Sequence, residues 1–182
     1  MVFVKSVKIR FFIYLAILSS TIFAHPHTFI EIYPNIKIKD NTIVNIDFKW
    51  KLDEMTSSML IMEFDQNQDG KIDKEETAYV YESFFKTLRD YNFYTDIKVK
   101  NLVQSFPEPK NFLVTIEENK VCYSFSIDKQ YNIKDTIIDF GDEDFFIAMI
   151  LKDEFVKIDG AKAKVEELDN DFYFGYRLRI EK

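Results

Sequence analysis

The sequence predicts an α+β fold of mainly antiparallel strands, arranged as a sandwich or an open barrel, with an inserted helix–loop–helix. Two patterns predict this class. Apolar and polar residues alternate with a period of two over most of the chain, whereas over residues 53–91 the apolar period becomes helical. The composition agrees, because 47% apolar residues in a chain of 182 can build the packed core of one domain.

The first 24 residues are typical of an export signal. Lys5, Lys8 and Arg10 precede an apolar stretch, and the small residue Ala24 precedes the expected cleavage site. The alternative is an uncleaved membrane anchor, for which an apolar run of about 14 residues is short. Cleavage after Ala24 leaves residues 25–182 as a single β-rich domain. Because the signal holds three basic and no acidic residues, the net charge falls from −7 to −10.

The expected strands follow the alternation along the chain. Asp40-Asn41 and Glu118-Asn119 separate pairs of alternating segments and are suited to tight hairpin turns. The alternation is clear in the first, second, fourth, fifth and last segments and weaker in the other four. The expected strands cover residues 29–39, 44–52, 97–103, 112–116, 121–127, 136–140, 145–151, 163–168 and 172–180.

Between the two expected helices, residues 65–76 match the EF-hand pattern for calcium. Oxygen-bearing side chains stand at loop positions 1, 3, 5, 9 and 12, glycine stands at position 6, and position 7 offers its backbone carbonyl. Calcium takes six to eight oxygen ligands, so a winding loop with alternate oxygen donors suits it. The expected calcium ligands are Asp65, Asn67, Asp69, Lys71, Asp73 and Glu76.

Two alternatives to a functional calcium loop stay open. The segment can be an acidic turn that binds nothing, or a retained loop of low affinity. Only one such loop is present in the sequence, and its position 8, Ile72, would normally pair with a second hand. That partner is absent, non-standard or supplied by another copy of the chain. A lone loop is expected to bind with a Kd on the order of 10⁻⁴–10⁻³ M.

The two histidines of the chain, His25 and His27, stand together in a His-Pro-His segment. After cleavage behind Ala24, the α-amine and imidazole of His25 and the imidazole of His27 could chelate zinc, nickel or copper. Pro26 lacks an N–H, which excludes the square-planar copper or nickel site that uses backbone amides. The alternative is that these residues merely begin a strand.

Other features limit the function. A pI near 5.0 argues against a nucleic-acid partner, and one cysteine excludes an internal disulfide and a CxxC zinc site. Because histidine occurs only near the N-terminus, no Ser–His or Cys–His pair is expected, and we predict no enzyme and no small-molecule substrate. Asp139, Asp142, Glu143 and Asp144 are expected in a solvated turn, with a second cation site as the alternative.

Three motifs carry a resemblance to a known family: His25-Pro26-His27-Thr28-Phe29, the segment from Trp50-Lys51-Leu52-Asp53-Glu54 to Ser57, and Phe64-Asp65 continuing to Glu76. The chain resembles bacterial periplasmic proteins of a domain-of-unknown-function family, described as the periplasmic component of an uncharacterised ABC-type transport system. The family's genes often lie beside nickel/cobalt-type permeases. The resemblance therefore implies handling of zinc, nickel or cobalt, with His25 and His27 as the matching ligands.

These observations predict an exported, periplasmic calcium-binding protein that acts as an accessory component of nickel, cobalt or zinc transport. Its expected partner is a membrane metal permease. The alternative is a calcium-stabilised structural or interaction module without a transition-metal role.

Overall fold

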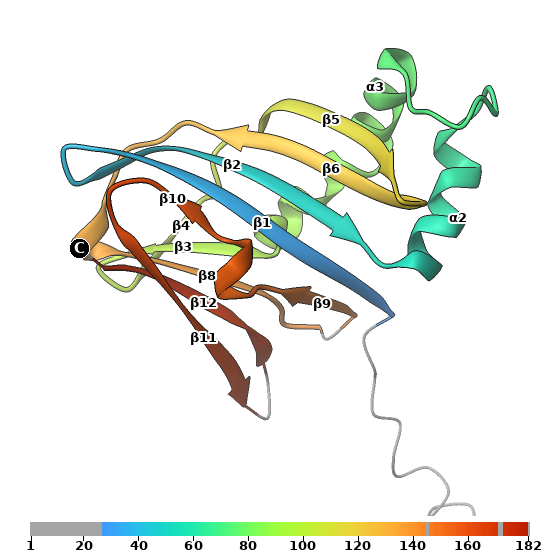
Figure 1. Ribbon diagram of the computed structural model, residues 1–182. Coiled ribbons are helices and arrows are strands. Elements are labelled where there is room, and N and C mark those ends of the chain that lie inside the picture. The colour runs from blue at the N-terminus through green and yellow to red at the C-terminus, as the bar shows by residue number, and fades with distance from the viewer. Residues whose placement is uncertain (1–26, 145, 171–172, 182) are drawn as a thin grey trace, which may run out of the picture.

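The computed structural model describes residues 27–144, 146–170 and 173–181 and contains two β-sheets with helices at one end (Figure 1). Sheet A contains β10 (Lys157–Ile158), β1 (Thr28–Lys39), β2 (Thr42–Leu52), β6 (Lys120–Ile127) and β5 (Lys110–Glu117) in that order, with β7 (Tyr131–Asn132) on β2 and β9 (Ile147–Ile150) on β1. Sheet B contains β11 (Lys162–Asn170), β12 (Tyr173–Glu181), β8 (Thr136–Asp142), β3 (Thr95–Val99) and β4 (Leu102–Gln104) in that order.

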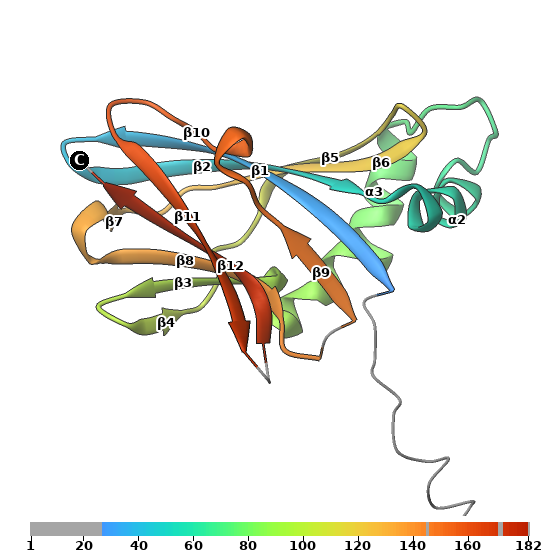
Figure 2. The ribbon, with the colours of Figure 1, turned by 60° about the horizontal axis from the view of Figure 1, so that its bottom comes forward.

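The predicted α+β class with mostly antiparallel strands is confirmed, and the two sheets form separate layers rather than a closed barrel (Figure 2). The expected signal, its cleavage site and His25 lie outside the described residues. In the part of the chain that the structure describes, no helix has the length and apolar character needed to cross a membrane.

Within the described ranges, three tight hairpins have two residues each with positive φ, the backbone conformation of a type I′ turn. Two of them, between β1 and β2 and between β5 and β6, lie where the sequence predicts them. The single strand expected over residues 97–103 is wrong, because the third turn divides it into β3 and β4. The turn residues are Asp40 and Asn41, Lys100 and Asn101, and Glu118 and Asn119, with φ between 51° and 65°.

The first strand also makes pairings that the local pattern does not predict. β1 pairs antiparallel with β2 but parallel with the short strands β9 and β10. Parallel neighbours require long connections, and β9 and β10 come more than 100 residues after β1. The C-terminal third of the chain therefore builds one edge of sheet A.

Aromatic side chains fill the space between the sheets. Phe48 from β2 packs on Phe125 from β6 at 5.1 Å between ring centroids and meets Phe140 from sheet B edge-on at 6.4 Å. Trp50 extends the cluster to Phe85, 5.9 Å away, in the segment after the helices. These contacts anchor the helical insertion to the core.

The insertion contains α2 (Glu54–Phe64), α3 (Lys74–Ser83) and the 3₁₀ segment η1 (Phe85–Tyr94). The helical period expected as far as residue 91 thus continues as a 3₁₀ helix rather than an α-helix. It ends where Asn92 and Phe93 adopt φ of 51° and 52°, which turns the chain into sheet B. Two further 3₁₀ turns, η2 (Ile133–Asp135) and η3 (Asp153–Phe155), lie between strands.

Candidate functional site

Asp53 joins the start of β1 to the start of α2. One carboxylate oxygen accepts the Thr56 N–H at 2.9 Å and so caps the helix, and the other accepts the Phe29 N–H at 2.9 Å. Burial acts to raise the pKa of Asp53, but these hydrogen bonds outweigh it and lower the pKa below its ordinary value. Ser57 similarly ties α2 to β6, because its hydroxyl accepts the Val121 N–H at 2.9 Å. These two motif residues therefore have structural roles.

The segment between the helices, residues 65–76, is here called the acidic loop. At its end, Asp73 and Glu76 form a capping box that begins α3. The Asp73 carboxylate accepts the Glu76 N–H at 2.9 Å, and the Glu76 carboxylate accepts the Asp73 N–H at 2.9 Å. The loop is thus fixed at its C-terminal end by two of the predicted calcium ligands.

Asp65 and Glu76, the first and last predicted ligands, are both buried, with 8% and 5% of their surfaces exposed. The Asp65 carboxylate accepts the backbone N–H groups of Asp69 and Gly70 at 3.0 and 2.8 Å. One oxygen of Glu76 also reaches back across the loop and accepts the N–H of Gln66 at 2.8 Å. The two ends of the loop are therefore folded around the same run of backbone.

The remaining predicted ligands lie on the intervening turn. The Asn67 side-chain oxygen accepts the Asp69 N–H at 2.9 Å, and an Asp69 oxygen accepts the Lys71 N–H at 2.9 Å. Gly70 has φ of +80°, a conformation that a residue with a Cβ rarely adopts. This explains why a glycine stands at the sharp turn of the loop.

The acidic loop carries five carboxylates and two lysines, a net charge of −3. Among the described residues none of these carboxylates forms an ion pair, so backbone N–H groups are the donors that meet Asp65 and Glu76. Hard oxygen donors with excess negative charge fit calcium chemically. The same residues are not gathered into a preformed group, since no three His, Cys, Asp or Glu side chains of the described ranges converge as metal ligands.

Ile72, at position 8 of the acidic loop, packs against the hydrophobic core of its own chain. In an EF-hand pair the residue at this position contacts the second EF-hand loop. The core contact anchors the loop internally. Phe64 and Phe84, which pack edge-on at 5.0 Å, connect the flanking helices in the same way.

His27 lies at the start of β1 and is exposed. The backbone N–H of His27 donates to the Phe146 carbonyl at 2.9 Å, and the His27 ring stacks near the Phe146 ring with 6.2 Å between centroids. His25 lies outside the described residues, so the structure does not test the two-histidine chelate. The Thr56 hydroxyl, in the first turn of α2, donates to the hydroxyl of Thr28, the residue after His27. His27 therefore lies near the start of α2, whereas the acidic loop follows its end.

The solvated turn expected around Gly141 is wrong for Asp139 and Asp142. Both belong to β8 and are buried, with 2% and 5% exposure, whereas Glu143 and Asp144 are exposed. Asp142 accepts three backbone N–H groups from the following turn. Sequence reasoning placed Asp142 in solvent because an acidic run around glycine resembles a loop.

Asp139 is held by two cations on neighbouring strands. Lys98 from β3 donates at 2.7 Å, and Arg177 from β12 donates from two nitrogens at 2.7 Å each. Burial acts to raise the pKa of Asp139, but the hydrogen bonds from Arg177 and Lys98 hold it below its ordinary value. This buried ion-pair cluster is a structural feature that local sequence patterns missed.

Comparisons with known proteins agree with the resemblance at the level of the family. The chain is 28% identical over 116 residues to an uncharacterized protein of Haemophilus influenzae, covering 60% of this chain and 52% of that protein. It is 24% identical over 94 residues to an uncharacterized 15.5 kDa protein from the trpE 3′ region of Spirochaeta aurantia, covering 50% of this chain and 67% of that one. The match thus spans about half the length of the Haemophilus relative. The family described as protein of unknown function (DUF1007) matches residues 10–169, and the chain belongs to this family.

Proposed function

We propose that this protein is an exported EF-hand-type calcium-binding protein that serves transition-metal transport as an accessory component. The observation that carries the calcium part is the acidic loop. Asp65 and Glu76, the first and last proposed ligands, stand at opposite ends of the loop. Both are buried, and their carboxylates accept backbone N–H groups of the segment between them. Cation binding would compensate the net negative charge that the loop concentrates there.

Calcium would act as a clamp between α2 and α3 rather than as a trigger. Phe64 and Phe84 already fix the helices to each other, and Ile72 fixes the loop to the core. A site with a Kd on the order of 10⁻⁴–10⁻³ M would be filled in a calcium-rich compartment. The bound ion would then stabilise the folded chain by mass action.

The calcium proposal is tested by a matched pair of variants, Glu76→Gln and Glu75→Gln. Both remove one negative charge from the same helical turn, but Glu76 is buried in the loop whereas Glu75 is exposed. Isothermal titration with calcium should lose its binding isotherm in Glu76→Gln and retain it in Glu75→Gln. Equal loss in both variants, or a wild type that takes up no calcium at millimolar concentration, would contradict the site.

The transition-metal part rests on the resemblance of the His25-Pro26-His27 motif and on the export signal that would expose it. A membrane metal permease is the proposed partner. N-terminal sequencing of the exported chain should find His25 as the first residue. Zinc and nickel titrations should then lose one site in a His25→Ala, His27→Ala double variant.

The second candidate is a calcium-stabilised structural or interaction module. The structural roles of the motif residues Asp53 and Ser57 favour it, because they explain part of the family pattern without any metal chemistry. Unchanged zinc and nickel affinity in the double histidine variant, with calcium binding intact, would select this alternative.

A further inference from the structure

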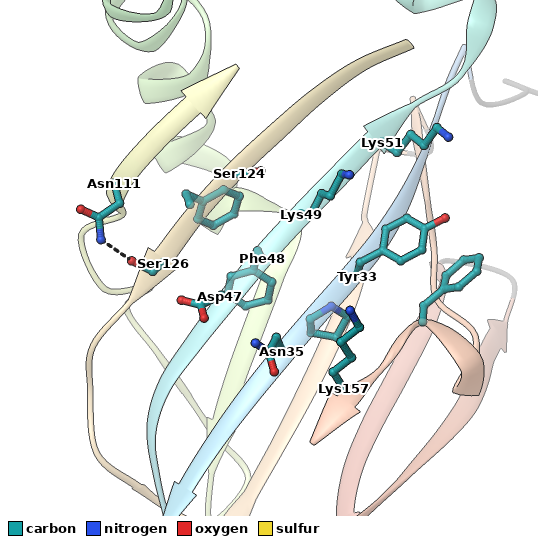
Figure 3. Close-up of a pocket in the computed structure, with 13 residues that line it drawn as sticks. Tyr33, Asn35, Asp47, Phe48, Lys49, Lys51, Asn111, Ser124, Ser126 and Lys157 are labelled. Carbon is teal, nitrogen blue, oxygen red and sulfur yellow. Dashed lines mark hydrogen bonds between the residues drawn. The ribbon is translucent and has the colours of Figure 1, made fainter. Parts of the chain in front are cut away.

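The outer face of sheet A, which points away from sheet B, combines charge and aromatic surface. Successive side chains of a strand point to opposite faces. Ile32 and Phe48 therefore lie in the core, whereas Tyr33 and Lys49, one position along each strand, lie on the outer face. Figure 3 shows side chains of β1, β2 and β6 on this face beside Lys157 of β10.

These side chains line a cavity of about 620 Å³, here called the outer-face cavity. Its volume lies within the range of roughly 300–1,000 Å³ that is typical of small-molecule sites. The part used below consists of Tyr33, Asn35, Lys49, Ser124, Phe155 and Lys157. The floor belongs to adjacent paired strands, so the positions of these groups are fixed by the ladder of sheet A.

More cationic than acidic side chains line the outer-face cavity among the described residues. Three lysines and one carboxylate line it, in a protein with a net charge of −7. The carboxylate, Asp47, is neutralised by Lys37 at 2.8 Å, and Lys37 lies outside the lining. Lys157 forms no ion pair within the described ranges. Lys49 and Lys51 are paired with Glu117 and Glu118, so Lys157 is the lysine of the lining that is left to meet an anionic group of a ligand.

The other two lysines are held in place from one side. Lys49 and Lys51 each pair with a glutamate at the β5–β6 turn, Glu117 and Glu118, at 2.6 Å. The hydrogen bond to Glu118 raises the pKa of Lys51 above its ordinary value, so this side chain stays charged. These pairs position the two ammonium groups along the cavity without placing a carboxylate in its lining.

An aromatic wall and free polar groups add specificity. The Phe155 ring lies on the Tyr33 ring with 4.3 Å between centroids and 34° between planes, and the Lys152 ammonium lies over the Phe155 ring at 5.2 Å from its centroid. One side of the cavity is therefore an aromatic wall. Across the floor, the side chains of Asn35 and Ser124 make no hydrogen bond to other described residues. A ligand with both hydroxyl groups and an apolar ring face would satisfy these groups together.

The kind of anion follows from the donors. A phosphate monoester carries nearly two negative charges at neutral pH, whereas the described lining offers one ammonium without an ion pair, Lys157. One such ammonium beside hydroxyl and amide groups matches the single charge of a carboxylate on a hydroxylated ring. We propose that the outer-face cavity binds a sugar acid of the hexuronate class, with its carboxylate at Lys157 and its ring against Phe155.

This proposal is independent of the calcium and transition-metal functions, because neither the acidic loop nor His27 contributes to the lining found among the described residues. The test is isothermal titration of the full exported chain with sodium D-glucuronate, in calcium-containing buffer and in EDTA. Saturable binding is expected in both. No heat of binding up to about 10 mM, the range of the weakest specific sites, would overturn the proposal.

Two variants locate the site. Lys157→Gln removes the unpaired ammonium and should weaken glucuronate binding about tenfold, the effect of one hydrogen bond to a charged group. Lys110→Gln is the matched control, because this exposed lysine of the same sheet lies outside the lining and pairs with Asp128 at 3.1 Å. An equal loss in both would mean diffuse charge attraction and would overturn the site.

Two other probes test the ligand class. D-Glucose, which lacks the carboxylate, and inorganic phosphate, which lacks the ring, should each bind at least about tenfold more weakly than glucuronate. Glucose of equal affinity would refute the role of the lysines. Phosphate of equal affinity would refute the role of the Tyr33–Phe155 wall. Phe155→Leu tests the same wall a second time, because it should weaken the binding of glucuronate but not that of phosphate.

Discussion

Buried carboxylates occur in two regions of this molecule with different electrostatic surroundings. Asp139 in sheet B is in contact with Lys98 and Arg177, so its negative charge is compensated within the chain. Asp65 and Glu76 in the acidic loop are nearly as buried but meet backbone N–H groups instead of cationic side chains. Burial of a carboxylate therefore does not by itself identify a metal ligand. The two regions differ in whether a cationic side chain of the chain compensates the charge of the buried carboxylate.

The largest expected effect comes from the compensated cluster. Asp139→Asn leaves Lys98 and Arg177 without their shared carboxylate and should lower the free energy of unfolding by about 3 kcal/mol. The loss should be the same with calcium and with EDTA in chemical denaturation experiments. Asp128→Asn, at an exposed aspartate that also pairs with a lysine, is the control and should leave the denaturation midpoint unchanged. A calcium-dependent loss in Asp139→Asn would break the distinction between the two regions.

The acidic loop should show the reverse behaviour. At about 1 mM calcium and a Kd of about 0.1 mM, the ion adds about 1.4 kcal/mol to the stability of the wild type. Asp65→Asn should remove this increment and leave most of the stability measured in EDTA, since the lost hydrogen bond is offset by relief of repulsion in the loop. Thermal melts of both proteins, with and without calcium, measure the difference. A calcium increment that survives in Asp65→Asn would show that Asp65 is not a ligand.

Gly70 tests the backbone of the same loop. Gly70→Ala should cost about 1 kcal/mol, because φ of +80° is strained for a residue with a Cβ even though nothing lies within 4 Å of the added atom. The cost should appear in EDTA, and calcium affinity should fall because the turn that orders the ligands is distorted. Ala78, exposed on α3, offers a control in Ala78→Gly, which perturbs backbone preference away from the loop. An unaltered calcium affinity in Gly70→Ala would mean that ligand geometry does not depend on this turn.

The contrast between these regions also explains how much could be predicted. The acidic loop could be picked out from the sequence because its predicted ligands lie within twelve consecutive residues, at the spacing of an EF-hand calcium loop. The Asp139 cluster was missed because its three members come from β8, β3 and β12, and only the strand order brings them together. The acidic residues around Gly141 instead suggested a turn exposed to solvent.

The same division holds for the fold. Alternation predicted β1, β2, β5 and β6 because the inward and outward faces are set residue by residue. The division of residues 97–103 into β3 and β4 was missed, although Lys100-Asn101 ends in Asn like the two turns that were predicted. The parallel pairing of β1 with β9 and β10 depends on distant segments, and no local pattern carries it.

Asp53 tests the contrast with a small effect. Like the carboxylates of the acidic loop it accepts backbone N–H groups, with the Thr56 hydroxyl as a further donor, but no cation is expected beside it. Its pKa is lowered in the folded state, so its charge adds stability above the ordinary aspartate pKa of about 4 and that stability is lost as pH falls through the lowered value. Asparagine keeps one acceptor oxygen for the helix cap but loses the hydrogen bond from the Phe29 N–H, so Asp53→Asn should cost about 1 kcal/mol at pH 7. The difference from wild type should close as pH falls through the lowered pKa of Asp53 and its carboxyl becomes protonated. Denaturation curves from pH 2 to 7 measure it, and a gap that persists at the lowest pH would mean that shape rather than charge makes Asp53 irreplaceable. Calcium should not alter this gap, since backbone N–H groups and the Thr56 hydroxyl already donate to the Asp53 carboxylate. A calcium-dependent gap would mean that this carboxylate takes part in calcium binding.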